Sequence, residues 1–261
     1  MRALDIAATG MDAQQTRVET ISNNLANMST TAYSPRRAEF ADLHYQTVRE
    51  PGAVNALNGA VLPTGLQLGL GVRTAAVSVD RVQGAVRQTG GELDVAIEGR
   101  GFIEVTLPSG AAAYTRDGAM KLTAEGLIVT TEGFPIEPEI TVPEDATSVT
   151  ITPDGEVLAS FEDKADQESL GQIAIVGFVN AKGLEAIGGN LFKETAASGA
   201  PNPGDPGIDG RGFFRQGFLE ESGVDAVREI TELIEAQRAY EMNAKVISAA
   251  DQMMGATVQI R

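Results

Sequence analysis

The chain has 261 residues, of which 43% are hydrophobic and 21% are charged, as in soluble globular proteins. This length is sufficient for one large domain or two modest ones with a buried core. There is no cysteine, which excludes disulfides and thiolate metal sites, and the formal net charge is −16. Because phosphate binding needs a basic surface, we do not expect nucleic acid as a partner.

The acidic side chains are concentrated in the middle of the sequence. Residues 72–223 carry 11 basic and 24 acidic side chains, whereas residues 1–37, 38–71 and 224–261 have net charges of only +1, −2 and −2. Like charges on a solvated surface keep neighbouring molecules apart. The acidic middle is therefore interpreted as a solvated outer face.

Two properties of the sequence bear on membranes and export. No run approaches the ~20 apolar residues needed to span a bilayer, so membrane insertion is not expected. The N-terminal residues MRALDIAATGMDAQQ lack the continuous apolar core and the small-residue cleavage site of a classical secretion signal. This predicts either a cytoplasmic protein or export by a route that does not cleave a signal.

Two rows of apolar residues recur at seven-residue spacing near the N-terminus. The rows consist of Leu4, Met11, Val18 and Leu25, and of Ala7, Ile21 and Met28. This spacing predicts that the N-terminal segment, residues 1–37, contains a helix of ~27 residues that packs along another helix. Polar Gln14 interrupts the second row, so the seam is expected to be weak. Pro35 and the Asn- and Thr-rich residues before it are expected to end the helix.

The C-terminal residues 224–261 repeat this pattern. Their rows consist of Leu233, Tyr240, Ile247 and Met254, and of Ala236, Asn243, Ala250 and Thr257. Ser222 followed by Asp225 resembles a capping box and predicts the helix start. We expect the two terminal helices to pair with each other like a coiled coil. Docking of both helices onto the β domain is the alternative, but seams this narrow favour helix-on-helix packing.

The period changes to two between the terminal helices. Turn dipeptides such as Asp117-Gly118 and Asp154-Gly155 separate short β-rich runs, and AAAYT, AMKLT, GLIVTT, SVTIT and EVLAS predict a β-meander. DVAIEG, GFIEVTL and GQIAIVGFV predict further strands, and residues 201–212 a loop. Residues 38–71 are broken by Pro and Gly, which predicts an extended arm. The expected fold class is α+β, with paired terminal helices, this arm and a central all-β domain over residues 72–223.

No established catalytic motif is present in the sequence. His44 is the single histidine, which rules out His-based triads and multi-His metal sites. The glycines of EGRGF match neither a dinucleotide-binding nor a P-loop pattern, and Asp205 and Asp209 lack the other ligands of an EF-hand. Carboxylates are numerous, so a hydrolase that uses two of them on the β domain stays open as an alternative.

Several longer stretches resemble members of the flagellar basal-body rod and hook family. NNLANMSTTAY followed by RRAEF matches the N-terminal signature, and EAQRAYEMNAKVISAADQMM matches the C-terminal one. DVAIEGRGFIEV, AYTRDGAMKL and LIVTTEGF follow in the family's order. LHYQTVREPGA and LPTGLQLGLGV resemble an arm that distinguishes distal rod subunits from the hook protein. The resemblance covers essentially the whole chain.

One departure from the family is local. Ala32-Tyr33-Ser34-Pro35 stands where family members often have Gly-Phe-Lys. The bend after the first helix is therefore expected to be stiffer or differently shaped.

The resemblance implies a non-enzymatic, cofactor-free structural subunit of the bacterial flagellar distal rod. Such subunits are exported by the flagellar type III apparatus and polymerise into a hollow drive shaft that spans the periplasm towards the outer membrane. The implied partners are further copies of the chain, proximal rod proteins, the hook protein and the surrounding bushing rings. A hook or proximal rod subunit of the same family is the nearest alternative.

In that frame the terminal helices form the inner tube, the arm packs between subunits and the β domain faces outward. The residues expected to mediate self-assembly are Leu4, Met11, Val18, Ile21, Leu25, Met28, Leu233, Tyr240, Ile247 and Met254. The residues expected to make arm contacts are Tyr45, Pro51, Leu62, Pro63 and Leu66.

Overall fold

The computed structural model describes residues 2–50, 64–162 and 167–259, and the side chains of the C-terminal helix as far as Gly255. Contacts divide the chain into two compact units. The helical unit comprises Met1–Ala26, Arg36–Val79 and Asp225–Arg261, and the β unit comprises Asn27–Pro35 and Asp80–Val224. The α+β class predicted from the sequence is confirmed.

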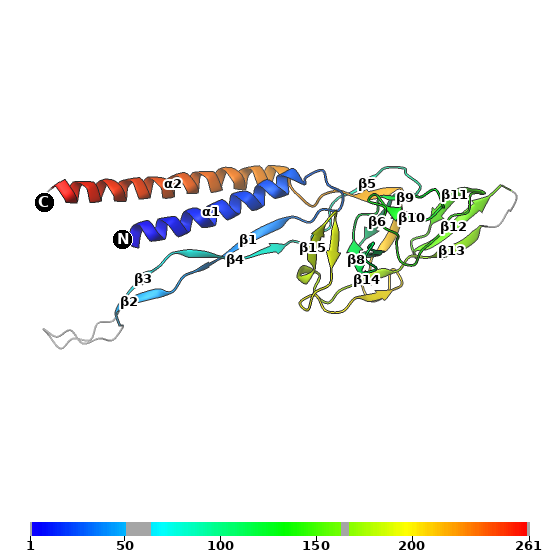
Figure 1. Ribbon diagram of the computed structural model, residues 1–261, viewed down its shortest axis with the longest axis horizontal. Coiled ribbons are helices and arrows are strands. Elements are labelled where there is room, and N and C mark those ends of the chain that lie inside the picture. Colours follow the sequence, from blue (N-terminus) through cyan, green and yellow to red (C-terminus); the bar gives the residue numbers. More distant parts are fainter. Residues whose placement is uncertain (1, 51–63, 163–166, 260–261) are drawn as a thin grey trace. The chain divides into compact units, whose positions relative to one another are not determined.

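Two long helices form one part of the helical unit. Helix α1 (Arg2–Ala26) and helix α2 (Ala226–Gln259) run side by side in opposite directions, so the two chain ends lie at the same end of the pair (Figure 1). Asp225 caps α2, because its Oδ1 accepts hydrogen bonds from the amides of Val227 at 3.0 Å and Arg228 at 3.2 Å. The predicted cap at Ser222 is wrong, and the helix begins three residues later than that prediction placed it.

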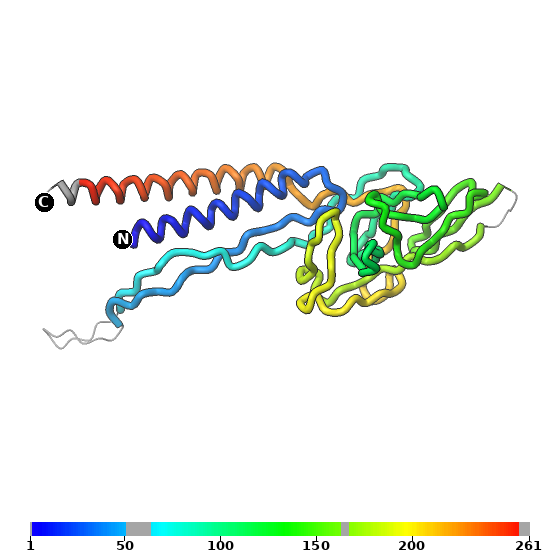
Figure 2. Tube along the Cα trace, in the orientation of Figure 1, coloured from blue at the N-terminus to red at the C-terminus, as the bar shows by residue number. Residues whose placement is uncertain are grey.

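A long antiparallel ribbon forms the other part. Strand β1 (Arg36–Asp42) pairs with β4 (Val72–Val79), and β2 (Tyr45–Arg49) pairs with β3 (Leu66–Gly69). Figure 2 traces the two sides of the ribbon alongside α1, which contacts both β1 and β4. Residues 72–79, assigned from the sequence to the outer β domain, belong to the helical unit because β4 pairs with β1 along its whole length.

The β unit contains short strands in several small sheets. Strands β15, β16, β8 and β7 form a four-stranded sheet, and β11, β12 and β13 a three-stranded one. Strands β6, β5, β9 and β14 pair with β18, β19, β10 and β17 respectively. The bounds are β5 Val86–Gln88, β6 Val95–Glu98, β7 Ile103–Thr106, β8 Ala112–Thr115, β9 Met120–Leu122, β10 Ile128–Thr130, β11 Ala146–Ile151, β12 Glu156–Phe161, β13 Glu168–Gln172, β14 Ile175–Gly177, a 3-10 turn Ala181–Gly183, β15 Glu185–Gly188, β16 Leu191–Lys193, β17 Asn202–Gly204, β18 Phe213–Gln216 and β19 Phe218–Glu220.

The predicted meander is only partly present. Two of its hairpins form, β9 with β10 and β11 with β12, but β8 pairs with β7 and β16 and not with β9. The reason lies at Gly118, whose carbonyl accepts a hydrogen bond from the amide of Val95 at 3.0 Å. A Cβ on Gly118 would lie 1.6 Å from the carbonyl oxygen of Val95. The turn at Asp117-Gly118 therefore carries the chain to another sheet.

The predicted loop over residues 201–212 also contains regular structure. Asn202–Gly204 forms β17, which pairs with β14. Pro203 has no amide hydrogen to donate, and such residues are confined to edge strands, which is the position of β17 in this two-stranded sheet.

The β unit has an extensive apolar core. Fully buried side chains from most of its strands pack together, and Ile97, Ile103 and Val157 are 0% exposed. A smaller aromatic cluster contains Phe102, Tyr114 and Phe192, with Phe102 and Phe192 in an edge-to-face contact at 5.9 Å.

The residues that follow α1 belong to the β unit by their hydrogen bonds. The amide of Ala32 donates to the carbonyl of Glu220 at 2.9 Å, and the side chain of Asn190 donates to the carbonyl of Thr31 at 3.0 Å. Ala32 itself has a φ of 54°, in the left-handed region that favours glycine. Ala32 therefore stands where family members often have Gly, and it adopts a backbone conformation that favours Gly.

Candidate assembly surface

Helix α1 contacts α2 along a row that lies beside the predicted apolar rows. Arg17 forms ion pairs with Glu232 at 3.5 Å and Glu235 at 3.8 Å. Seven residues away on either side, Gly10 faces Asn243 and Asn24 contacts Glu229. The contacts towards α2 thus follow residues 10, 17 and 24.

Small residues allow the elements of the helical unit to approach closely. A Cβ on Gly10 would lie 2.9 Å from Asn243 Nδ2, and one on Gly71 would lie 2.2 Å from Thr9 Oγ1. Gly71 also has a φ of 117°, which a residue with a side chain rarely adopts. Most of the apolar side chains buried in the helical unit are themselves small, namely Ala7, Ala13, Ala236 and Ala250.

Asn24 connects α1 to both of its neighbours. Its side chain is 1% exposed and exchanges two hydrogen bonds with the backbone of Arg36 in β1, one at 2.8 Å to the carbonyl and one at 2.9 Å from the amide. Its Nδ2 also donates to Glu229 Oε2 of α2 at 3.2 Å. Asn24 lies in the NNLAN stretch of the sequence. Its hydrogen bonds to β1 and α2 could not be predicted from the spacing of the apolar residues.

Burial around Asn24 affects the carboxyl group of Glu229. Loss of hydration raises the pKa of Glu229 above its usual value, and Glu232 adds to the rise. The hydrogen bond from Asn24 and the charges of Arg228 and Arg37 act in the opposite direction. The α1–α2 contact therefore contains a group whose protonation favours the folded form.

The predicted residues of α1 differ in burial. Ile21 is buried at 3% exposure, whereas Leu4, Met11, Val18 and Leu25 are half-buried. Met28 lies beyond the end of α1, in the turn that belongs to the β unit, and is 51% exposed.

The predicted residues of α2 are less buried than Ala236 and Ala250 of the second row. Leu233, Ile247 and Met254 are half-buried and Tyr240 is 44% exposed, whereas Ala236 is 0% exposed. Contacts of these residues, and of the predicted residues of α1, with other copies of the chain stay a prediction.

Sequence reasoning missed a second apolar surface on α2. Val227, Ile230 and Ile234 are 76%, 46% and 45% exposed, and their spacing puts them on one face. Ile234 precedes the buried Ala236 by two positions, which at about 100° per residue places it on the side opposite α1. Met242, Val246 and Met253, at 60%, 48% and 65% exposed, form a further strip. Their positions i, i+4 and i+11 could have been found from the sequence.

The ribbon also exposes apolar side chains. Of the predicted arm residues, Tyr45 is 57% and Leu66 is 51% exposed. Pro51, Leu62 and Pro63 lie outside the described residues. Further exposed apolar side chains of the ribbon are Phe40, Val48, Leu68, Leu70 and Val77.

Within residues 2–50, 64–162 and 167–259, no group of three or more His, Asp or Glu side chains is placed to hold a metal ion. None of the described helices is long and apolar enough to cross a membrane. Burial, with the charges of Glu137 and Glu194, raises the pKa of Glu104, and burial with the charges of Glu104 and Glu194 raises that of Tyr114 to about 12. Glu104 and Tyr114 lie opposite each other on the paired strands β7 and β8.

Three family models match successive parts of the chain. The model described as flagella basal body rod protein matches residues 4–33. The flagellar hook protein FlgE/F/G D1 domain matches residues 96–159, and the flagellar basal body rod FlgEFG protein C-terminal model matches residues 215–260. The matched segments include both terminal helices and the centre of the β unit.

Full-length relatives are similar over nearly the whole chain. The flagellar basal-body rod protein FlgG of Agrobacterium fabrum is 51% identical, over 97% of this chain and 97% of its own length. That of Caulobacter vibrioides is 49% identical over 100% of both chains, and that of Bacillus subtilis is 35% identical over 100% of this chain and 99% of its own. The chain therefore belongs to the flagellar basal-body rod protein family.

Proposed function

We propose that this chain polymerises helically into the hollow distal rod, the drive shaft that transmits torque from the flagellar motor to the hook. The chain is a structural rod subunit of the flagellar basal body, and its family assembles there with other rod and hook proteins. The proposal adds the distal position, the helical polymer and the division of labour among the segments.

The main observation that supports this proposal is the exposed apolar surface of the helical unit. Seven large apolar side chains of α2 are exposed, among them Val227 at 76% and Met253 at 65%. Exposed apolar patches on a folded chain commonly mark contacts with other molecules. These strips lie on faces of α2 other than the row that meets α1, so one chain cannot cover them with its own helix pair.

In the proposed shaft, helices α1 and α2 form the inner tube. The ribbon of strands β1–β4, which contains the predicted arm of residues 38–71, packs between subunits, and the acidic β unit faces outward. The same chain contacts proximal rod proteins below, hook protein above and the bushing rings around it, after export by the type III apparatus. Contacts of one copy with the next that use two different surfaces and do not close produce an open helical polymer.

Two aspartates on the exposed strip test the polymer. The variant Ile230→Asp with Ile234→Asp should form no filaments by electron microscopy, because burying two carboxylates at an apolar contact is unfavourable. The matched control, Ser109→Asp with Ser169→Asp, adds the same charge at exposed polar positions of the β unit, outside α2, and should form filaments. Filaments of the first variant at the wild-type protein concentration would contradict the proposed surface.

A further inference from the structure

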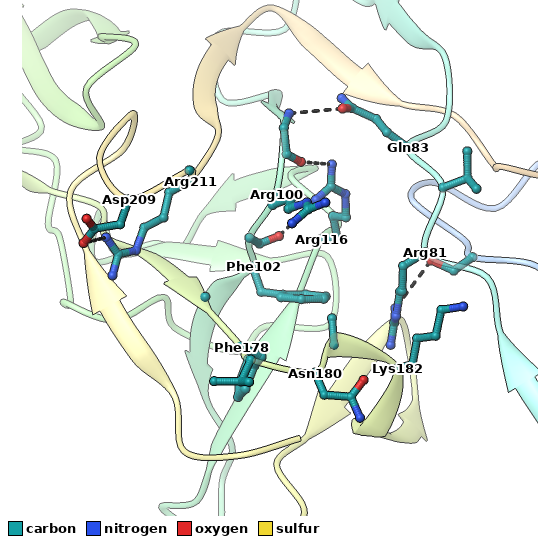
Figure 3. A pocket seen from close by; sticks show the side chains of 18 residues that line it. Arg81, Gln83, Arg100, Phe102, Arg116, Phe178, Asn180, Lys182, Asp209 and Arg211 are labelled. Carbon is teal, nitrogen blue, oxygen red and sulfur yellow. Dashed lines mark hydrogen bonds and ion pairs between the residues drawn. The ribbon is translucent and has the colours of Figure 1, made fainter. Parts of the chain in front are cut away.

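The β unit contains a basic pocket within an acidic surface. Residues 80–224 have 10 basic and 24 acidic side chains, yet five of the basic ones line a single pocket of about 670 Å³. The five are Arg81, Arg100, Arg116, Lys182 and Arg211. Figure 3 shows Arg81 and Lys182 on one side, Arg211 with Asp209 on the other, and Phe102 and Phe178 between them.

Two of these cations already have strong partners inside the fold. Arg116 donates from Nε to Glu220 Oε2 at 2.6 Å, and its NH2 donates to the carbonyl of Gly99 at 2.7 Å. The guanidinium of Arg81 stacks on the ring of Phe192, with 4.0 Å between its Cζ and the ring centre. These contacts hold the pocket wall in place.

Arg211 is buried with weak partners. Its side chain is 7% exposed, its NH1 lies 3.4 Å from Asp209 Oδ2, and its NH2 lies 3.3 Å from the carbonyl oxygen of Asn202. Its Nε is buried and has no hydrogen-bond partner among the described residues. The Nε atom lies close to Gly177, which lines the pocket. The distance from Nε to the position that a Cβ on Gly177 would occupy is 3.9 Å. A buried guanidinium in this state favours an additional acceptor.

Arg100 and Lys182 complete the positive charge at the pocket. Both side chains are exposed, and neither forms an ion pair with any residue in the described part of the chain. The backbone of Arg100 pairs with that of Arg211, which places two arginines on neighbouring segments of one wall. Val179, which also lines the pocket, is 95% exposed. The pocket thus combines unpaired positive charge with an exposed apolar side chain.

We infer that this pocket receives the acidic segment of residues 137–145 from a second copy of the chain. This inference rests on the proposed polymer for the presence of a second copy. Glu137, Glu139, Glu144 and Asp145 are all exposed, and no basic residue lies in the segment. None of these residues lines the pocket of its own chain. Carboxylates accept the charge-assisted hydrogen bonds that arginine offers.

The charge pattern of the chain favours a second copy as the source of these carboxylates. The basic pocket and the acidic segment of residues 137–145 are different surfaces of the same chain, so every such contact uses two different surfaces. Contacts of this kind join copies head to tail and produce a ring or an open helix. The pocket contact is therefore compatible with helical growth and adds a bond at the level of the β unit.

Reciprocal charge exchange in the full chain tests the inference. One variant carries Arg100→Glu with Lys182→Glu, and the other carries Glu139→Lys with Glu144→Lys. Each alone should associate with itself about tenfold more weakly than the wild type, because like charges then meet at every contact. A mixture of the two variants should associate within about threefold of the wild type, since both contacts then join opposite charges.

The control variant is Lys121→Glu with Lys193→Glu, which changes the charge equally at exposed positions outside the pocket. It should associate like the wild type. Affinity between pairs is measured by fluorescence anisotropy with one labelled full-length chain, and polymers are observed separately by electron microscopy.

The two readouts separate this inference from the proposed function. Wild-type filaments together with exchange variants that behave like the control would overturn the pocket contact and leave the polymer intact. Restoration in the mixture without wild-type filaments would support the pocket contact and count against the polymer. Exchange variants that associate normally but fail to complete basal bodies in cells would assign the pocket to a different protein, which also overturns the inference.

Discussion

The helical unit and the β unit differ in what they bury. The β unit packs a continuous core of Ile, Val and Phe side chains, many of them at 0% exposure. The helical unit buries mainly alanines, with Ile21 as its one large aliphatic side chain below 5% exposure among the described residues. Because burial of apolar area is the main source of stability, the β unit can hold its fold within one chain. The helices instead keep large apolar side chains available for other molecules.

The largest expected effect comes from the core of the β unit. Ile103→Ala should lower the free energy of unfolding of this unit by about 3 kcal/mol, because a fully buried side chain leaves a cavity. Ile187→Ala, at a position that is 44% exposed, should change it by less than about 0.5 kcal/mol. Urea unfolding followed by near-ultraviolet circular dichroism measures both. Equal effects would show that the core is not the main support of this unit.

A smaller effect is expected at the polar connection of the helical unit. Asn24→Ala should cost about 2 kcal/mol locally, because the amide and carbonyl of Arg36 lose their buried partner. Amide hydrogen exchange at Arg36 and along α1 should accelerate, while exchange in the β unit stays unchanged. Ser22→Ala, at an exposed position of the same helix, serves as the control. Unchanged exchange at Arg36 would contradict the role given to Asn24.

The bend after α1 should respond unusually to glycine. Replacing Ala32 by Gly relieves the left-handed strain but removes a buried methyl group and adds freedom to the unfolded chain. These terms nearly cancel, so the free energy of unfolding should change by less than about 0.5 kcal/mol. Ala113→Gly, buried in β8, has no strain to relieve and should cost about 1–2 kcal/mol. If chemical denaturation shows that both variants lose the same free energy of unfolding, the backbone of Ala32 is not strained.

The smallest effect concerns pH. The pKa of Glu229 is raised in the folded state, so the folded form binds more protons than the unfolded form above the usual value of 4.5. The stability of the helical unit should therefore fall as pH rises through this window, and acidification from neutral pH should restore it. Thermal unfolding of the helices by circular dichroism at 222 nm measures the slope. Glu229→Gln should flatten that slope, and an unchanged slope would exclude Glu229 as its source.

The sequence predicted local elements better than the contacts between distant ones. Both helices, and eight of the nineteen described strands (β6–β12 and β14), follow from seven- and two-residue periods, which depend on neighbours along the chain. The pairing of β8 with β16 and the place of β4 in the ribbon depend on segments far apart in sequence. The pocket unites Arg81, Lys182 and Arg211, whose separation of up to 130 positions leaves no local pattern.

The N-terminal signature shows the same limit within a few residues. The spacing of Leu4, Met11 and Val18 predicts a helix correctly, but the row that meets α2 contains Gly10, Arg17 and Asn24. Glycine and polar residues carry no apolar signal, so a search for apolar periods passes over them. Close backbone approach and side-chain hydrogen bonds select these residues, and both become visible only with the neighbouring elements present.

The division of the chain has a mechanical consequence. Since the two units alternate along the sequence, the backbone passes from one to the other after residues 26, 35, 79 and 224. Four covalent links join the units where a simple two-domain protein has one. In the proposed shaft, four peptide segments therefore share a twisting load on the β unit, and no single linker bears the whole torque.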